Sequence, residues 1–181
     1  MLGRALLLLL GLALCGVVQA ATPPRIELSL TPAWKGWARP GRATEIDVRV
    51  GADAATQARL ELVASRQSVR ADLELQPGRV LRLHLPANAV EGLFATMATA
   101  QGPTRRHEIA ISRSESPLLA VGLASEHSVR LPGFHTVALT ADDLPRNVAA
   151  YASIDALILD APTLGALDPS QLEALLSHAA A

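Results

Sequence analysis

The chain has 181 residues, half of them apolar and only 3% aromatic, and its formal net charge is −1. This length suffices for one medium domain or two small ones, each with its own core. The balanced charge offers no clustered basic surface of the kind that phosphates require, so we expect no nucleic-acid partner.

The first 20 residues have the three-part pattern of a secretory signal peptide. Arg4 precedes an apolar stretch over 5–18 that is short for a membrane span, and Val18 and Ala20 stand at the positions that a signal peptidase reads. We therefore predict cleavage after Ala20 and export to the periplasm or to the periplasmic face of the inner membrane. Lipidation at Cys15 and an uncleaved membrane anchor stay open as alternatives.

Cys15 is the only cysteine in the sequence. After cleavage the chain would have no disulfide, no thiol nucleophile and no thiolate ligand for a metal.

Residues 25–113 alternate between apolar and polar positions, with turn sequences in between. One buried face and one wet face are typical of antiparallel sheets, and several short strands in this length predict an immunoglobulin-like β-sandwich. The expected strands cover 26–30, 43–50, 58–64, 68–75, 79–85, 93–99 and 106–112.

The pattern changes after a polar hinge at 114–117. Continuous apolar runs at 118–124, 135–139 and 154–159, separated by helical or loop material, are typical of parallel strands buried on both faces. We therefore predict that a second, α/β domain with a parallel sheet begins at residue 117 and extends through 181.

A closing helix is specified in detail by the last residues. Asp168 is a good N-cap, Pro169 suits the first helical position, and Gln171 completes a capping box. Three strands with one or two helices bury little surface. The sequence therefore predicts that this α/β domain is incomplete and that the native protein continues past Ala181.

Two stretches resemble a family of bacterial cell-envelope proteins, in which an immunoglobulin-like sandwich precedes a class I glutamine-amidotransferase-like α/β domain. The first holds an aromatic–Gly–aromatic stretch and then Arg-Pro-Gly; the second, residues 139–180, has a Leu-Pro loop, a Tyr, an apolar strand and a helix. In the first stretch the matching residues are Trp34, Gly36, Trp37, Arg39, Pro40 and Gly41. Family members usually continue with a Gly-Gly, another strand and often a membrane helix.

The resemblance implies an exported envelope protein, facing the periplasm, that serves as a binding or assembly module. Active amidotransferases need a cysteine on a sharp turn and a later histidine, and no mature residue here can be that cysteine. We therefore assign no catalytic residue and no cofactor, and expect this chain not to be an enzyme. Partners would be envelope or inner-membrane proteins, with membrane association through the N-terminal segment or a later helix. The alternative is an enzyme whose active residues follow Ala181.

Three aspartates are candidate ligand-binding residues. Asp160 ends an apolar strand, and Asp142 and Asp143 follow another, so all three could lie at the carboxyl edge of the parallel sheet, where α/β proteins bind ligands. The other interpretation is that they cap turns and helices. The histidines lack metal-ligand spacing, and we expect no metal site.

Trp34 and Trp37, the only tryptophans, are the second candidate site. Exposed, they could stack on a sugar or a peptide, which makes a carbohydrate- or peptide-binding module an alternative function. Packed, they would fill one end of the sandwich or its contact with the second domain.

Overall fold

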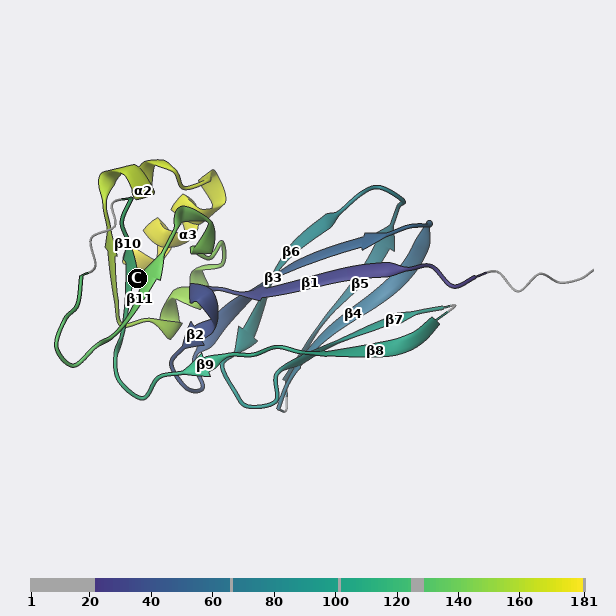
Figure 1. The fold of residues 1–181 in the computed structure, drawn as a ribbon, viewed down its shortest axis with the longest axis horizontal. Coiled ribbons are helices and arrows are strands. Elements are labelled where there is room, and N and C mark those ends of the chain that lie inside the picture. Colours follow the sequence, from purple (N-terminus) through teal and green to yellow (C-terminus); the bar gives the residue numbers. More distant parts are fainter. Residues whose placement is uncertain (1–21, 66, 101, 125–128, 181) are drawn as a thin grey trace, which may run out of the picture.

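The computed structural model describes residues 22–65, 67–100, 102–124 and 129–180. The predicted signal segment, with Arg4 and Cys15, lies outside the described residues. Figure 1 shows an elongated two-sheet part, residues 25–113, and a smaller parallel-sheet part, residues 117–180, next to each other along the long axis.

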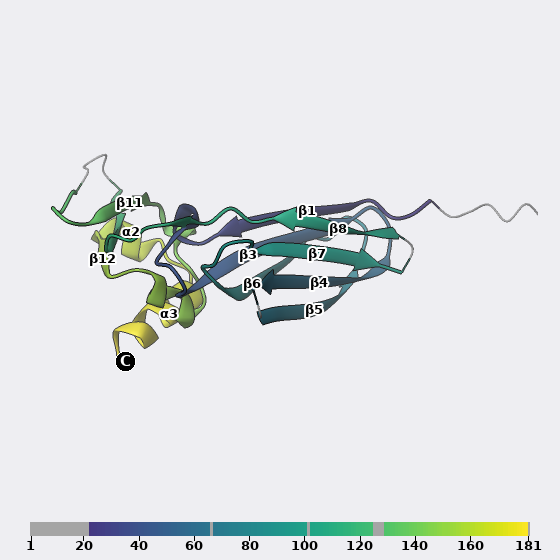
Figure 2. The same ribbon diagram turned by 90° about the horizontal axis from the view of Figure 1, so that it is seen from below.

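Seven antiparallel strands form the two larger sheets of the two-sheet part (Figures 1 and 2). The first sheet has the order β1-β3-β6 and the second β5-β4-β7-β8. Their bounds are β1 Ile26–Pro32, β3 Ala43–Ala52, β4 Thr56–Ala64, β5 Gln67–Leu75, β6 Leu81–Asn88, β7 Phe94–Thr99 and β8 Gly102–Glu108. The antiparallel arrangement predicted from the alternating pattern is confirmed.

The core of this part lies between the two sheets. Ile46, Val48 and Val50 of β3 pack in one cluster with Leu60 and Leu62 of β4, and all five side chains are at most 2% exposed. Every second residue of β3 therefore points inward, as the period of a strand requires.

The seventh predicted strand, at 106–112, was placed too late in the chain. The structure has β8 at Gly102–Glu108, and Ile109 leaves the ladder, donates its N–H to the Leu93 carbonyl and turns into the core. The apolar alternation of Ile109 and Ile111 reflects packing against the core after the strand has ended, which periodicity alone cannot distinguish from a strand.

The parallel-sheet part contains three short strands in the order β11-β10-β12: β10 Leu118–Gly122, β11 His135–Leu139 and β12 Ala156–Leu159. All five residues of the central β10 are buried, whereas the four residues of β12 are only half-buried. The predicted small parallel sheet is thus confirmed, with β12 at its edge.

Short helices follow the strands. The 3-10 helices η2 (Ala141–Asp143) and η3 (Val148–Ser153) connect β11 to β12, and α2 (Ala161–Gly165) and α3 (Pro169–Ala179) come after β12. The start of α3 matches its prediction, because Asp168 is the N-cap and forms a capping box with Gln171.

Candidate functional site

The junction between the two parts begins with a left-handed turn, η1 (Trp34–Gly36). Trp34, Lys35 and Gly36 have φ values of 55°, 52° and 80°. A left-handed conformation costs about 1–2 kcal/mol for a residue other than glycine. Lys35 Nζ lies 3.6 Å from Asp143 Oδ2 across the junction.

Burial of the Trp34 side chain offsets this strain. The indole is 0% exposed, donates from Nε1 to the Ala150 carbonyl oxygen at 3.0 Å, and meets the Tyr151 ring edge-on with centroids 5.2 Å apart. Burying an indole of about 200 Å² at about 25 cal/mol per Å² contributes roughly 5 kcal/mol, more than the strain of two residues. Trp34 thus belongs to the core of the parallel-sheet part, although it precedes most of the sandwich strands.

Trp37 is half-buried in the two-residue strand β2 (Trp37–Ala38), which pairs in parallel with β9 (Ser112–Arg113). Its ring centroid lies 3.9 Å from that of His135. The two candidate tryptophans therefore both lie at the junction, and Trp34 has no exposed face on which a ligand could stack.

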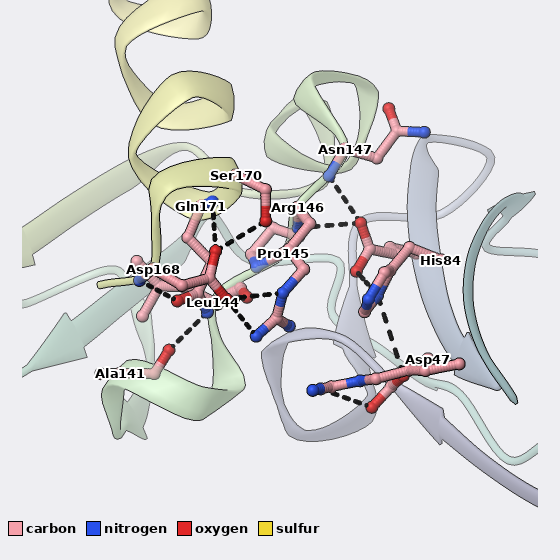
Figure 3. A network of polar contacts seen from close by, with 12 residues as sticks. Asp47, His84, Ala141, Leu144, Pro145, Arg146, Asn147, Asp168, Ser170 and Gln171 are labelled. Atoms are coloured by element: carbon pink, nitrogen blue, oxygen red, sulfur yellow. Dashed lines mark hydrogen bonds and ion pairs between the residues drawn. The ribbon is translucent and has the colours of Figure 1, made fainter. Parts of the chain in front are cut away.

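Glu45 of β3 is a buried carboxylate at this junction, only 2% exposed. Its Oε2 accepts hydrogen bonds from the backbone N–H groups of Arg146 at 2.9 Å and Asn147 at 2.6 Å, and its Oε1 lies 3.1 Å from His84 Nδ1 (Figure 3). His84 belongs to β6 and is also 3.8 Å from Asp47 Oδ1. One side chain of the first sheet therefore fixes the backbone of a loop about a hundred residues later in the chain.

That loop is tied in turn to the start of α3 (Figure 3). Arg146 Nε donates to Asp168 Oδ2 at 2.8 Å, and Gln171 Nε2 donates to the carbonyl oxygens of Ala141 and Leu144 at 2.7 and 2.8 Å. We call Glu45, His84, Arg146, Asn147, Asp168 and Gln171 the junction network. It connects a strand of the first sheet to the closing helix through a single loop.

The surroundings shift two pKa values in this region. Burial raises the pKa of Tyr151 above its ordinary value, and the nearby Glu45 carboxylate adds to the effect. Burial also disfavours ionised Asp168, but hydrogen bonds from Ser170, the Gln171 backbone and Arg146 outweigh it and lower the pKa of Asp168 to about 2. Tyr151 therefore stays a neutral donor, and Asp168 stays an anion.

A second set of polar contacts holds the other side of the junction. Asp155 accepts from the Leu118 backbone N–H at 2.8 Å and lies 3.5 Å from Arg39 Nε and 3.4 Å from Arg42 Nη1. Arg39 also donates to the carbonyl oxygens of Ser114 and Glu115 in the hinge. The Arg-Pro-Gly stretch and the following Arg42 thus place two guanidinium groups beside one carboxylate of the parallel-sheet part.

Two of the three candidate aspartates, Asp143 and Asp160, cap helices in this structure. Asp143 accepts from the N–H and the hydroxyl of Thr140 and completes the capping box of η2, while its neighbour Asp142 is exposed. Asp160 caps α2, and hydrogen bonds from Thr163 and the Ala124 backbone hold its pKa below the usual range. Asp143 and Asp160 follow β11 and β12, which flank β10 on opposite sides.

Within the described residues, no three acidic, histidine or cysteine side chains gather closely enough to hold a metal ion. No helix in the described part of the chain is long and apolar enough to cross a membrane.

An apolar groove of about 390 Å³ opens between the edge strand β12 and the helices. Its walls include Leu157 and Leu159 of β12, Leu164 of α2, and Leu175 and His178 of α3. Leu164 is 44% exposed and Leu176, on the next position of α3, is 59% exposed. This end of the molecule therefore presents apolar side chains to solvent.

Sequence reasoning missed Glu45, Arg146 and Asp155. Glu45 occupies a position of β3 that the alternating pattern assigns to the wet face, and only the neighbouring loop buries it. The local sequence contains no signal for the burial of Glu45, because the groups that surround its carboxylate come from distant residues.

The chain matches no protein-family model and no curated protein. Among solved structures it has a weak similarity to a β-glucosidase, EmGH1 from Erythrobacter marinus, with 15% sequence identity and a TM-score of 0.29. That similarity covers 49% of this chain and 16% of the β-glucosidase, and at this TM-score it carries no argument about fold or activity.

Proposed function

We propose that the chain is an exported protein of the bacterial cell envelope and acts as a non-catalytic binding or assembly module. In this proposal residues 25–113 are an immunoglobulin-like sandwich and residues 117–181 belong to an α/β domain of the amidotransferase or flavodoxin type. The strand order β11-β10-β12 supports the second assignment, because the second and third strands flank the first, as in flavodoxin-like sheets.

The junction network is the observation that carries the proposal. A buried carboxylate that accepts two backbone N–H groups needs both parts in one relative position, since either part alone would leave buried polar groups unpaired. A fixed relative position suits a protein that presents one surface to a partner. It is not needed by two independent domains on a linker.

The two ends of the molecule have different roles in this proposal. The described chain starts at the end of the two-sheet part that is far from the parallel sheet (Figure 1). The sandwich would then be a spacer between the N-terminal, membrane-side segment and the parallel-sheet part. The exposed Leu164 and Leu176 would contact an envelope or inner-membrane protein.

The alternative module, in which Trp34 and Trp37 bind a sugar or a peptide, has less support because Trp34 is fully buried. The enzyme alternative depends on residues after Ala181 and stays a prediction.

Site-specific photo-crosslinking in living cells tests the assembly role. A photoreactive amino acid at Leu164 or Leu176 should form an adduct with one defined envelope protein. The matched control is Val80, which is 65% exposed on the two-sheet part and should form none. The proposal fails if Leu164 and Leu176 give no adduct, or if Val80 gives the same one.

Cell fractionation with N-terminal sequencing tests export. The mature product should start at Ala21 and accumulate in the periplasmic or inner-membrane fraction. A cytoplasmic product with an intact N-terminus would contradict the localisation.

A further inference from the structure

A small hollow lies on one open side of the two-sheet part, between β1, an edge strand of the first sheet, and β8, an edge strand of the second. Its volume is about 140 Å³, and its apolar lining includes Ile26 and Leu28 of β1 and Met97 of β7. Three prolines, Pro23, Pro24 and Pro103, complete the apolar walls. The hollow is therefore an extension of the core that is open to solvent along one edge.

Two basic residues of β8, Arg105 and His107, line this hollow. Arg105 pairs with Met97 and His107 pairs with Ala95 across the β7–β8 ladder, and Met97 and Ala95 are core residues at 3% and 0% exposure. Residues directly opposite each other in an antiparallel ladder point to the same face. Arg105 and His107 therefore occupy core-facing positions, which are ordinarily apolar in packed sheets.

Arg106, between them, points the other way. Its guanidinium carbon lies 3.7 Å above the Phe94 ring on the outer face of the sheet. Arg105 and Arg106 thus have the same charge and adjacent positions on one strand, and both are exposed, but they lie on opposite faces of the sheet.

The hollow has a third basic residue and no carboxylate in its lining. Arg25, directly before β1, lines it with Arg105 and His107. The nearby Asp53 accepts from the Arg25 backbone N–H at 2.8 Å. Among the described residues no ion pair involves Arg25, Arg105 or His107. Cations beside an apolar hollow without a protein partner attract an external anion.

We propose that this hollow binds a small amphipathic carboxylate, with its apolar group against Ile26, Leu28 and Met97 and its carboxylate beside Arg105 and Arg25. The size of the apolar group follows from the volume, because an apolar cavity of about 150 Å³ accommodates one benzene ring. The ligand therefore has a single ring or a short branched chain. The proposal stands on this hollow alone and is independent of the function proposed for the junction and the parallel-sheet part.

Titration of the full chain with benzoate, followed by the amide NMR signals of Met97 and Gly102, tests the site. Benzyl alcohol is the matched neutral probe, and we expect it to bind at least about tenfold more weakly, since a charged hydrogen bond contributes about 1.5–3 kcal/mol. R105Q should weaken benzoate binding by at least about tenfold, whereas R106Q should change it by less than about twofold.

The comparison of the two probes on the unmodified protein decides the question even if R105Q fails to fold. Equal affinity for benzoate and benzyl alcohol, no benzoate binding at millimolar concentration, or equal losses in R105Q and R106Q would overturn the proposal. Arg105 would then serve only to keep the β8 edge from pairing with another strand.

Discussion

Replacement of Glu45 by alanine should weaken the contact between the two parts of the molecule and lower the free energy of unfolding. Each hydrogen bond to a charged group contributes about 1.5–3 kcal/mol, and Glu45 accepts two from the backbone N–H groups of Arg146 and Asn147. The substitution also removes the desolvation cost of the buried carboxylate, which offsets part of this loss. We therefore expect E45A to lower the free energy of unfolding by about 3 kcal/mol.

E45Q should cost less, about 1 kcal/mol, because the amide oxygen can still accept from both N–H groups. E27A is the matched control: Glu27 lies on the exposed face of β1, and its removal should change stability by less than about 0.5 kcal/mol. The comparison isolates the acceptor at the junction from the general effect of removing a carboxylate.

Urea unfolding with two probes measures the effect. Trp34 and Trp37 are the only tryptophans and both lie at the junction, so their fluorescence reports the junction, whereas far-UV circular dichroism reports mainly the strands of the two-sheet part. For a urea dependence of about 2 kcal/mol per molar, the fluorescence midpoint of E45A should fall by about 1.5 M. The circular dichroism midpoint should fall less.

Equal midpoints for E45A and E27A would refute the reasoning, because the two backbone N–H groups would then find other partners without cost. A coincident fall of both signals would keep the energetic role of Glu45 but show that the two parts unfold as one unit.

Three further predictions concern the parallel-sheet part. Gln171 donates to two carbonyl oxygens, so Q171E should lower the free energy of unfolding in urea by about 3 kcal/mol, and Q171M should lower it less. Equal stability of Q171E and the unmodified protein would contradict this role. Because the pKa of Asp168 is lowered to about 2 in the folded state, its stabilising contribution is complete above its unfolded pKa near 4 and is lost as the pH falls toward 2. Urea midpoints measured over that range should therefore fall less steeply for D168N, and an unchanged slope would disprove the assignment. A Cβ on Gly122 would lie 2.7 Å from Leu159 Cδ2, so G122V should cost about 1–3 kcal/mol by thermal unfolding. G165A is its control, since a Cβ there meets nothing within 4 Å, and an equal effect of both would contradict the packing argument.

Local features of the sequence predicted much of the structure. The alternation of Ile46, Val48 and Val50 placed them in the core, and the capping box of Asp168 and Gln171 fixed the start of α3. These predictions depend on neighbours within a few residues, where periodicity and hydrogen-bond reach are set by the backbone itself. The predicted end of β8 was wrong because Ile109 is apolar for core packing and not for strand pairing.

The candidate site was less accessible from sequence. The closeness of the two tryptophans in sequence indicated an aromatic site, but not that Trp34 enters a core made mainly of residues after 117. Asp160 stands at the end of an apolar strand, where the sequence left both ligand binding and capping open, and the short helix α2 shows that it is a cap.

The sequence by itself predicted an export signal, and it determined the alternating and continuous apolar patterns and the helix capped by Asp168. Each of these features depends on residues that are close along the chain. Only the tertiary structure decided that Glu45 would be buried against Arg146 and Asn147, and that Arg105 would line a hollow while Arg106 lies over the Phe94 ring. Burial and charge pairing depend on which distant groups the fold brings together, and the residues around one position in the sequence do not specify those groups.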